Sequence, residues 1–283
     1  MSTLLPASLE TWAAPAKLNL FLHITGRRDD GYHELQTIFQ LLDVGDVLAF
    51  DVTDVPDIER VTAVSGVAAE DDLVVKAARL LQKKTSCRRG VKIHIDKQLP
   101  MGGGLGGGSS DAATTLVALN RLWGCGLAVD ELAVLGKSLG ADVPVFVRGE
   151  TAWAEGIGEK LTAIELAPQW FVVLRPAVEI ATAALFASPE LTRDCPRIKI
   201  RDFLASGGEN VFEPLVRKQY PEVDKAMKWL DKFSPSRLTG TGSCIFAAVA
   251  DKAEAARILA QLPAGLTGFA AQGVNRSPLL QMD

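Results

Sequence analysis

A run of six glycines within seven positions, Gly102 to Gly108, most constrains what this chain can fold into. The run follows VKIHID, residues 91–96, whose alternation is typical of a half-exposed strand, and it precedes a helical pattern that begins at Asp111. Glycine allows backbone amides to turn inward and lets a ligand approach the main chain. A strand, a glycine loop and a helix in this order aim free N–H groups and a helix N-terminus at one point. The sequence therefore predicts a phosphate-binding loop.

Other interpretations of the glycine run are weaker. In a flexible linker, Ser109 or Ser110 would merely cap the helix, but linkers rarely lie so tightly between two strongly patterned elements. The P-loop pattern requires a glycine where the sequence has Glu131. A dinucleotide fingerprint is formally present at Gly102, Gly104 and Gly107, but any glycine-dense run produces it, and no strand ending in an acidic residue follows the helix.

A serine hydrolase is another candidate class, because residues 136–140 satisfy the GxSxG pattern. That motif needs a preceding strand, whereas VDELAVL, residues 129–135, has a helical pattern. It also needs a histidine after Ser138, and the three histidines of the chain all lie before it. The sequence therefore disfavours a serine hydrolase.

Composition narrows the remaining classes of function. The 283 residues are 48% hydrophobic and 23% charged, with a formal charge of −4, so the chain lacks the basic face that nucleic acid needs. No apolar run approaches the roughly 18 residues of a membrane span, and four scattered cysteines suggest neither a zinc site nor a disulfide framework. We expect a cytoplasmic protein that acts on a small molecule, with no nucleic-acid, membrane or obligate protein partner.

Strand and helix patterns are mixed along the chain rather than strictly alternating, which favours an α+β fold. Strands are expected at 16–26, at 91–96 and near 171–174, and a break is expected at the Gly45-Asp46 pair. A glycine-spaced turn at EGIGEKL precedes a new strand pattern. We therefore predict an N-terminal domain over 1–155 and a C-terminal domain over 156–283.

Four separated segments carry a more specific pattern: PAKLNLFL at 15–22, PMGGGLGGGSSDAA at 100–113, LGADVPVFV at 139–147 and LTGTGSCIF at 238–246. Together they resemble the small-molecule kinase superfamily that includes galactokinase, homoserine kinase and mevalonate kinase. Within it, the doubled glycine stretch and GYHELQT at 31–37 resemble the branch that phosphorylates a cytidine diphosphate-linked methylerythritol in the non-mevalonate isoprenoid pathway. The resemblance extends over nearly the whole chain.

The resemblance implies a two-domain α+β kinase that binds ATP, Mg²⁺ and substrate in the cleft between its domains. It assigns Asp142 as the catalytic base and Lys17 as its partner, whose ammonium would favour the ionised carboxylate. The residues expected to bind ATP are Lys97, Pro100, Gly102, Gly103, Gly104, Leu105, Gly106, Gly107, Gly108, Ser109 and Ser110. The residues expected to bind the substrate are Asn19, Tyr32, His33, Thr182, Phe186, Gly240, Thr241 and Gly242, with Tyr32 stacking on cytosine opposite Phe186.

Taken alone, several of these residues have plainer interpretations. Asp142 precedes Val-Pro and could simply cap a helix, and a lone lysine such as Lys17 in an apolar strand usually reaches the surface. Tyr32 and His33 follow a glycine turn and could be a surface tyrosine and a solvated histidine. The sequence also departs from the family pattern at position 72, where an aspartate replaces the asparagine expected near adenine.

Overall fold

The computed structural model describes residues 5–281. It contains a ten-stranded sheet in which seven strands follow the order β3-β4-β2-β10-β7-β9-β8. Outside this order, β1 and β5 pair with β2, and β6 pairs with β5. The strands are β1 (Thr11–Arg27), β2 (His33–Thr53), β3 (Ile58–Arg60), β4 (Gly90–Asp96), β5 (Ala152–Glu155), β6 (Lys160–Ala163), β7 (Trp170–Arg175), β8 (Ser236–Leu238), β9 (Ile245–Val249) and β10 (Thr267–Val274). The helices are η1 (Ala69–Asp71), α1 (Leu73–Thr85), α2 (Gly107–Leu122), α3 (Val129–Lys137), α4 (Val143–Arg148), α5 (Thr182–Ala187), α6 (Ile200–Ser206), α7 (Glu213–Gln219), α8 (Pro221–Leu230), α9 (Lys252–Leu259) and η2 (Pro278–Gln281).

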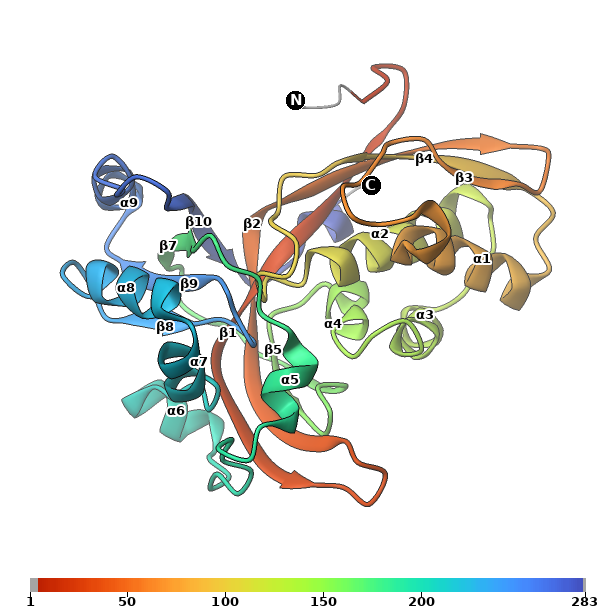
Figure 1. Ribbon diagram of the computed structural model, residues 1–283. Helices are drawn as coiled ribbons and strands as arrows, with labels where there is room; N and C mark the ends of the chain where they lie inside the picture. The colour runs from red at the N-terminus through yellow and green to blue at the C-terminus, as the bar shows by residue number, and fades with distance from the viewer. Residues whose placement is uncertain (1–4, 282–283) are drawn as a thin grey trace.

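The antiparallel pair β1 and β2 runs through the whole molecule, with α1 to α4 on one side of it and α6 to α9 on the other (Figure 1). The sequence predicted a break in β2 at Gly45, and this prediction is wrong. Gly45 pairs with Pro15 inside a continuous strand, and a Cβ atom on Gly45 would lie 2.1 Å from the carbonyl oxygen of Ala14. Glycine is needed there because the two backbones approach closely, not because the chain turns.

Two large apolar cores flank this central pair. The first packs α1 to α4 against the sheet and includes Trp12, Leu48, Leu81, Leu116 and Phe146. The second packs α5 and α7 to α9 against β7 to β9 and includes Leu174, Leu185, Phe212, Met227 and Ile258. The first core draws on residues 12–154 and Leu279, and the second on residues 22–258. A division of the chain at residue 155 stays a prediction.

Helix α2 begins earlier than its apolar pattern indicated. The sequence predicted a start at Asp111, but the first helical residue is Gly107 and the cap is Gly106, with a φ of 74°. Glycine has a low helix propensity, which is why the pattern missed this turn. The consequence is functional: the second half of the glycine run is the N-terminus of a 16-residue helix.

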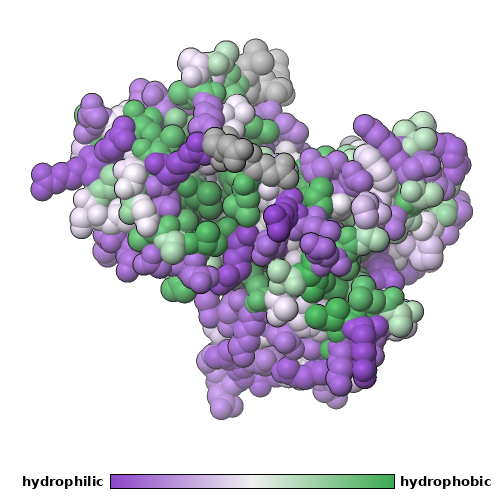
Figure 2. All heavy atoms as spheres, turned by 180° about the vertical axis from the view of Figure 1, so that it is seen from behind, coloured by the Kyte–Doolittle hydropathy of each residue, from purple (hydrophilic) through white to green (hydrophobic). Residues whose placement is uncertain are grey.

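The surface is mixed in character. Seen from behind, polar side chains cover most of the outer edges, and apolar side chains gather in patches between them (Figure 2). Within residues 5–281, no helix is long and apolar enough to cross a membrane.

Candidate active site

A cavity of about 680 Å³ opens where β1, β2, the glycine loop, α4 and α5 meet. Its wall includes Phe39 of the first core and Phe212 of the second. The cavity therefore lies between the two halves of the fold. The predicted site residues that line it are Lys17, Asn19, Lys97, Pro100, Gly102, Gly103, Gly104, Leu105, Gly106, Gly107, Gly108, Ser109, Asp142, Thr182, Phe186, Gly240, Thr241 and Gly242. Tyr32, His33 and Ser110 do not line it.

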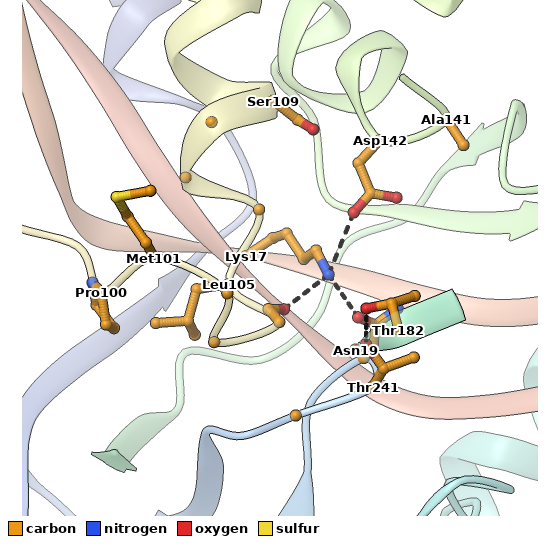
Figure 3. Close-up of a pocket in the computed structure, with 18 of the residues that line it drawn as sticks. Lys17, Asn19, Pro100, Met101, Leu105, Ser109, Ala141, Asp142, Thr182 and Thr241 are labelled. Carbon is orange, nitrogen blue, oxygen red and sulfur yellow. Dashed lines mark hydrogen bonds and ion pairs between the residues drawn. The ribbon is translucent and has the colours of Figure 1, made fainter. Parts of the chain in front are cut away.

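The ammonium of Lys17 is buried at the centre of this cavity, although a lone lysine in a strand usually reaches solvent. It donates to Asn19 Oδ1 at 2.6 Å and to the Gly104 carbonyl oxygen at 2.8 Å, and it lies 3.4 Å from Asp142 Oδ2 (Figure 3). Lys17 therefore makes two hydrogen bonds and an ion pair from one ammonium. Lys17 thus joins β1, the glycine loop and the start of α4 at one point.

Asp142 occupies the N-cap position of α4, as the simpler interpretation of the sequence predicted. However, its side chain makes no capping hydrogen bond. The carboxylate turns toward Lys17 instead, and 32% of the Asp142 side chain remains exposed. One face of this carboxylate is therefore held by a cation while the rest stays open to a ligand in the cavity.

At Gly104 and Gly106 the glycine loop is packed too tightly for any larger residue. A Cβ atom would lie 2.2 Å from the Thr239 carbonyl oxygen if added to Gly104, and 2.8 Å from the Phe146 ring if added to Gly106. Both glycines have a positive φ, 76° and 74°. The loop is also hydrogen-bonded on both sides, because the Lys17 amide donates to the Leu105 carbonyl and the Cys244 amide donates to the Gly103 carbonyl. It is a rigid cradle, which excludes the linker interpretation.

Beside the loop, Lys97 bridges two buried carboxylates. Its ammonium lies 2.5 Å from Asp46 Oδ2 and 2.7 Å from Asp111 Oδ2. Asp46 Oδ1 accepts from the backbone amides of Gln98 and Leu99 at 2.6 and 2.7 Å. Asp46 thereby fixes the segment that leads from β4 into the glycine loop, and Asp111 fixes Lys97 to the first turns of α2.

Burial shapes the charge of this cluster. Desolvation, reinforced by the neighbouring Asp46, raises the pKa of Asp111 to about 8, against the opposing effect of Lys97. For Lys97, burial alone would lower the pKa, but the two carboxylates outweigh it and raise the pKa. Asp111 Oδ1 is buried without a hydrogen-bond partner among the described residues. The ion pair with Lys97 and the raised pKa of Asp111 both limit the negative charge beside the loop.

Next to Lys17, Asn19 is fixed by three contacts. Its side chain donates to Thr37 Oγ1 at 2.9 Å and accepts from Lys17, and its backbone amide donates to Thr239 Oγ1 at 3.0 Å. Close by, the hydroxyls of Thr182 and Thr241 lie 2.8 Å apart (Figure 3). Gly240 to Gly242 therefore face the same space as Asn19.

The three aromatic residues expected around cytosine are only partly brought together. The rings of His33 and Phe186 lie 5.1 Å apart between centroids and are tilted by 33°. Tyr32 is 61% exposed and lies outside the residues that line the cavity. The stacking role of Tyr32 stays a prediction.

Several residues that hold the site in place carry no recognisable signal in the sequence. Asp46, Thr37 and Thr239 are all buried, and each fixes a predicted site residue by a hydrogen bond: Asp46 binds Lys97, Thr37 binds Asn19, and Thr239 binds Gly104. Their partners are distant in the chain, so no local pattern marks them. Asp72, which replaces the asparagine that the family pattern places near adenine, accepts from the Val74 amide and from Arg60 and caps α1 at the cavity wall.

Comparison with known proteins identifies the class. The family described as "GHMP kinases N terminal domain" matches residues 72–150, and "GHMP kinases C terminal" matches residues 195–267. The Methanococcus jannaschii mevalonate kinase, 17% identical, superimposes with a TM-score of 0.70 over 96% of this chain and all of that chain, which shows the shared fold. The protein is thus a two-domain GHMP kinase with mixed α and β structure.

More similar proteins define the family within this class. The 4-diphosphocytidyl-2-C-methyl-D-erythritol kinase of Nitrosococcus oceani is 56% identical, over 95% of this chain and 96% of that protein. The one from Shewanella halifaxensis is 53% identical over 95% of each. A crystal structure of a 4-(cytidine 5'-diphospho)-2C-methyl-D-erythritol kinase, 31% identical, gives a TM-score of 0.82 over 94% of this chain and 100% of that chain. The chain belongs to the 4-diphosphocytidyl-2-C-methyl-D-erythritol kinase family and is an ATP-dependent kinase.

Proposed function

We propose that this protein transfers the γ-phosphoryl group of ATP to the 2-hydroxyl of 4-diphosphocytidyl-2-C-methyl-D-erythritol, a step of non-mevalonate isoprenoid synthesis. The observation that carries the proposal is the Lys17–Asp142 pair, because it places an accessible carboxylate and a buried ammonium directly beside the glycine loop. A kinase acting on an alcohol needs this juxtaposition of a proton acceptor and a phosphate cradle.

Asp142 acts as the base in this mechanism. The substrate oxygen forms a bond to the γ-phosphorus, the bond from that phosphorus to the β–γ bridging oxygen breaks, and ADP leaves. The hydroxyl proton passes to Asp142. The ammonium of Lys17 lies 3.4 Å from the Asp142 carboxylate and positions it. Hydrogen bonds to Asn19 and Gly104 hold this ammonium in its buried position. Because phosphoryl transfer depends mainly on positioning, this fixed geometry accounts for much of the rate.

The phosphates of ATP are assigned to the glycine loop and the start of α2. The unpaired amides of the first helical turn and the positive end of the helix dipole favour negative charge there. Among the described residues, no group of three or more His, Cys, Asp or Glu side chains could hold a metal ion. Mg²⁺ would enter with the nucleotide and would supply charge neutralisation beside the glycine loop.

The substrate occupies the other side of the cavity. Asn19, Thr182 and Thr241 provide hydrogen-bonding groups near the reacting hydroxyl, and the ring of Phe186 provides an apolar face for the cytosine. His33, packed against Phe186, is assigned to the polar edge of the base. Tyr32 would reach the base from its exposed position on the turn before β2.

ADP release by the purified protein with ATP and Mg²⁺ tests the proposal, with 4-diphosphocytidyl-2-C-methyl-D-erythritol, homoserine, mevalonate and galactose compared at equal concentrations. We expect turnover on the cytidylylated alcohol alone. Turnover on another alcohol would be consistent with the role of Asp142 but would contradict the assignment of a cytosine-binding site. Absence of turnover on all four would favour a nucleotide-binding protein without kinase activity.

A further inference from the structure

Two of the four cysteines meet at the C-terminal ends of neighbouring helices, outside the residues that line the cavity. Cys87 follows α1 and Cys125 follows α2, and these two helices pack side by side against the first core (Figure 1). Both thiols are free and half-buried. The thiol of Cys125 is hydrogen-bonded to that of Cys87 and lies 3.6 Å from the hydroxyl of Thr85, the last residue of α1. Two cysteines that are distant in the sequence therefore form a pair in the fold.

Backbone contacts hold the loop after α1 against the end of α2. Arg89 Nη1 donates to the Leu122 carbonyl oxygen at 3.0 Å, and Trp123 Nε1 donates to the Gly90 carbonyl oxygen at 3.3 Å. The amide of Arg89 also donates to Cys87 Sγ at 3.5 Å. The residues on both sides of the two thiols are thus tied across the helix ends, so the contact between the thiols does not depend on their side chains alone.

The other two cysteines have different surroundings. Burial raises the pKa of Cys244 to about 12, which keeps this thiol protonated and unreactive. Cys195 is half-buried, as the paired cysteines are, and burial raises its pKa as well. The charged groups near Cys195 are the carboxylates of Asp194 and Glu209. Cys195 is therefore a natural control for a half-buried thiol outside the pair.

We propose that Cys87 and Cys125 are a reversible thiol–disulfide site, which closes on exposure to a low-molecular-weight disulfide such as glutathione disulfide and crosslinks the ends of α1 and α2. The pair is close enough to need only small movements, and it lies in loops that follow the helices rather than inside them. The proposal goes beyond the kinase reaction and does not depend on the identity of the substrate.

The reaction is two successive exchanges. The Cys87 thiolate attacks one sulfur of glutathione disulfide, the bond between the two glutathione sulfurs breaks, and one glutathione leaves as its thiolate. The Cys125 thiol then gives its proton to solvent and attacks Cys87 Sγ, which releases the second glutathione. The protein loses two hydrogen atoms, and glutathione disulfide gains them. Burial raises the pKa of Cys125, which favours Cys87 as the first attacking thiol.

The crosslink acts on stability rather than on catalysis. Helix α2 has 16 residues and begins at the glycine loop, so its far end lies about 24 Å from that loop. The disulfide would close a loop of roughly 40 residues, which restricts the unfolded chain and favours the folded one. We expect the oxidised protein to resist unfolding and to keep the geometry of the cavity.

Peptide mapping of the wild-type protein is the first test. The reduced protein is incubated with glutathione disulfide, its remaining thiols are alkylated, and its proteolytic peptides are analysed by mass spectrometry. We expect one disulfide that joins the peptides of Cys87 and Cys125, with Cys195 and Cys244 alkylated. Four alkylated cysteines, a lasting glutathione adduct on Cys87, or a disulfide that includes Cys195 would each overturn the proposal.

Thermal unfolding and kinetics are the second test. Oxidation should raise the Tm of the wild type by about 5 °C or more, and dithiothreitol should reverse this rise. Cys195→Ser should show the same rise, whereas Cys87→Ser and Cys125→Ser should show none under the same treatment. The kcat and the KM for ATP of the oxidised wild type should stay within about twofold of the reduced protein. An unchanged Tm in crosslinked wild type, or a larger change in these constants, would contradict a crosslink that acts on stability.

Discussion

The ammonium of Lys17, on β1, lies 3.4 Å from the carboxylate of Asp142, at the start of α4, in the wall of the interdomain cavity. The lysine is almost fully buried, whereas about a third of the aspartate side chain is exposed. The two side chains therefore differ in their exposure: the Lys17 ammonium is packed inside the protein, whereas the Asp142 carboxylate is open to a ligand in the cavity. This asymmetry suits a base that must accept a proton without changing position.

Replacing Lys17 with methionine should reduce both activity and stability. The variant leaves Asn19 Oδ1 without its buried donor, which costs about 1–3 kcal/mol in the free energy of unfolding. It also removes the cation that positions Asp142, for which we expect kcat to fall roughly 10²-fold. ADP release and urea unfolding measure the two effects. Lys92→Met, on the exposed face of β4, is the control and should change neither.

Gly104→Ala should abolish tight ATP binding because the new methyl group would meet the Thr239 carbonyl oxygen at 2.2 Å. A displacement of the loop by about 1 Å is enough to lower kcat/KM for ATP roughly 10²-fold. Gly126→Ala is the matched control, since Gly126 also has a positive φ, 71°, but has nothing within 4 Å of the added Cβ atom. If both variants bind ATP equally well in calorimetry, the packed cradle is not the phosphate site.

Asp111 should make stability depend on pH. Its pKa is raised to about 8 in the folded protein from an ordinary value of 3.8, so folding takes up a proton between these pH values. Wild-type stability should therefore fall as pH rises from about 4 to 8, and the decline should end above the folded pKa. Asp111→Asn removes this contribution. Urea unfolding at pH 5 and pH 8.5 should show a smaller loss for Asp111→Asn than for wild type, and the same loss in both proteins would contradict the raised pKa.

Tyr32→Ala tests whether the exposed tyrosine contributes to the base site. Stacking of a base on an aromatic ring contributes roughly 1–3 kcal/mol, so KM for the cytidylylated substrate should rise roughly 5- to 150-fold. Because Tyr32 is 61% exposed, its removal should leave the free energy of unfolding unchanged. Leu204→Ala, 61% exposed on α6, is a control of equal exposure. An unchanged KM in Tyr32→Ala would show that Tyr32 does not stack on the base and is an ordinary surface residue.

The sequence was sufficient for the class of fold and for the position of the glycine run between a strand and a helix, because both depend on local patterns. The glycine run lies between a strand and a helix, as predicted, and alternation placed β4 correctly over residues 91–96. Lys17 and Asp142, by contrast, could be assigned only through the family resemblance. Nothing local distinguishes Asp142 from an ordinary helix cap, and it occupies that cap position in the structure.

The rest depended on contacts between distant parts of the chain. Gly45 was predicted as a turn, but it lies where two paired strands approach closely, and predicting this requires knowledge of the partner strand. Asp46 belongs to β2, yet its carboxylate binds the amides of Gln98 and Leu99 at the loop. Arg193 reaches His33 across most of the chain. Long-range contacts of this kind leave no periodic signal in the sequence.

Steady-state kinetics of Asp142→Asn test the central claim most directly. The amide keeps the shape of the carboxylate but cannot take up the hydroxyl proton, so kcat should fall roughly 10²- to 10⁴-fold. Binding of ATP and of the cytidylylated substrate, measured by calorimetry, should stay near the wild-type affinities. Asp130→Asn, at an exposed ion pair with Arg148, should retain full kcat. A wild-type kcat in Asp142→Asn would show that the carboxylate beside Lys17 is not the base.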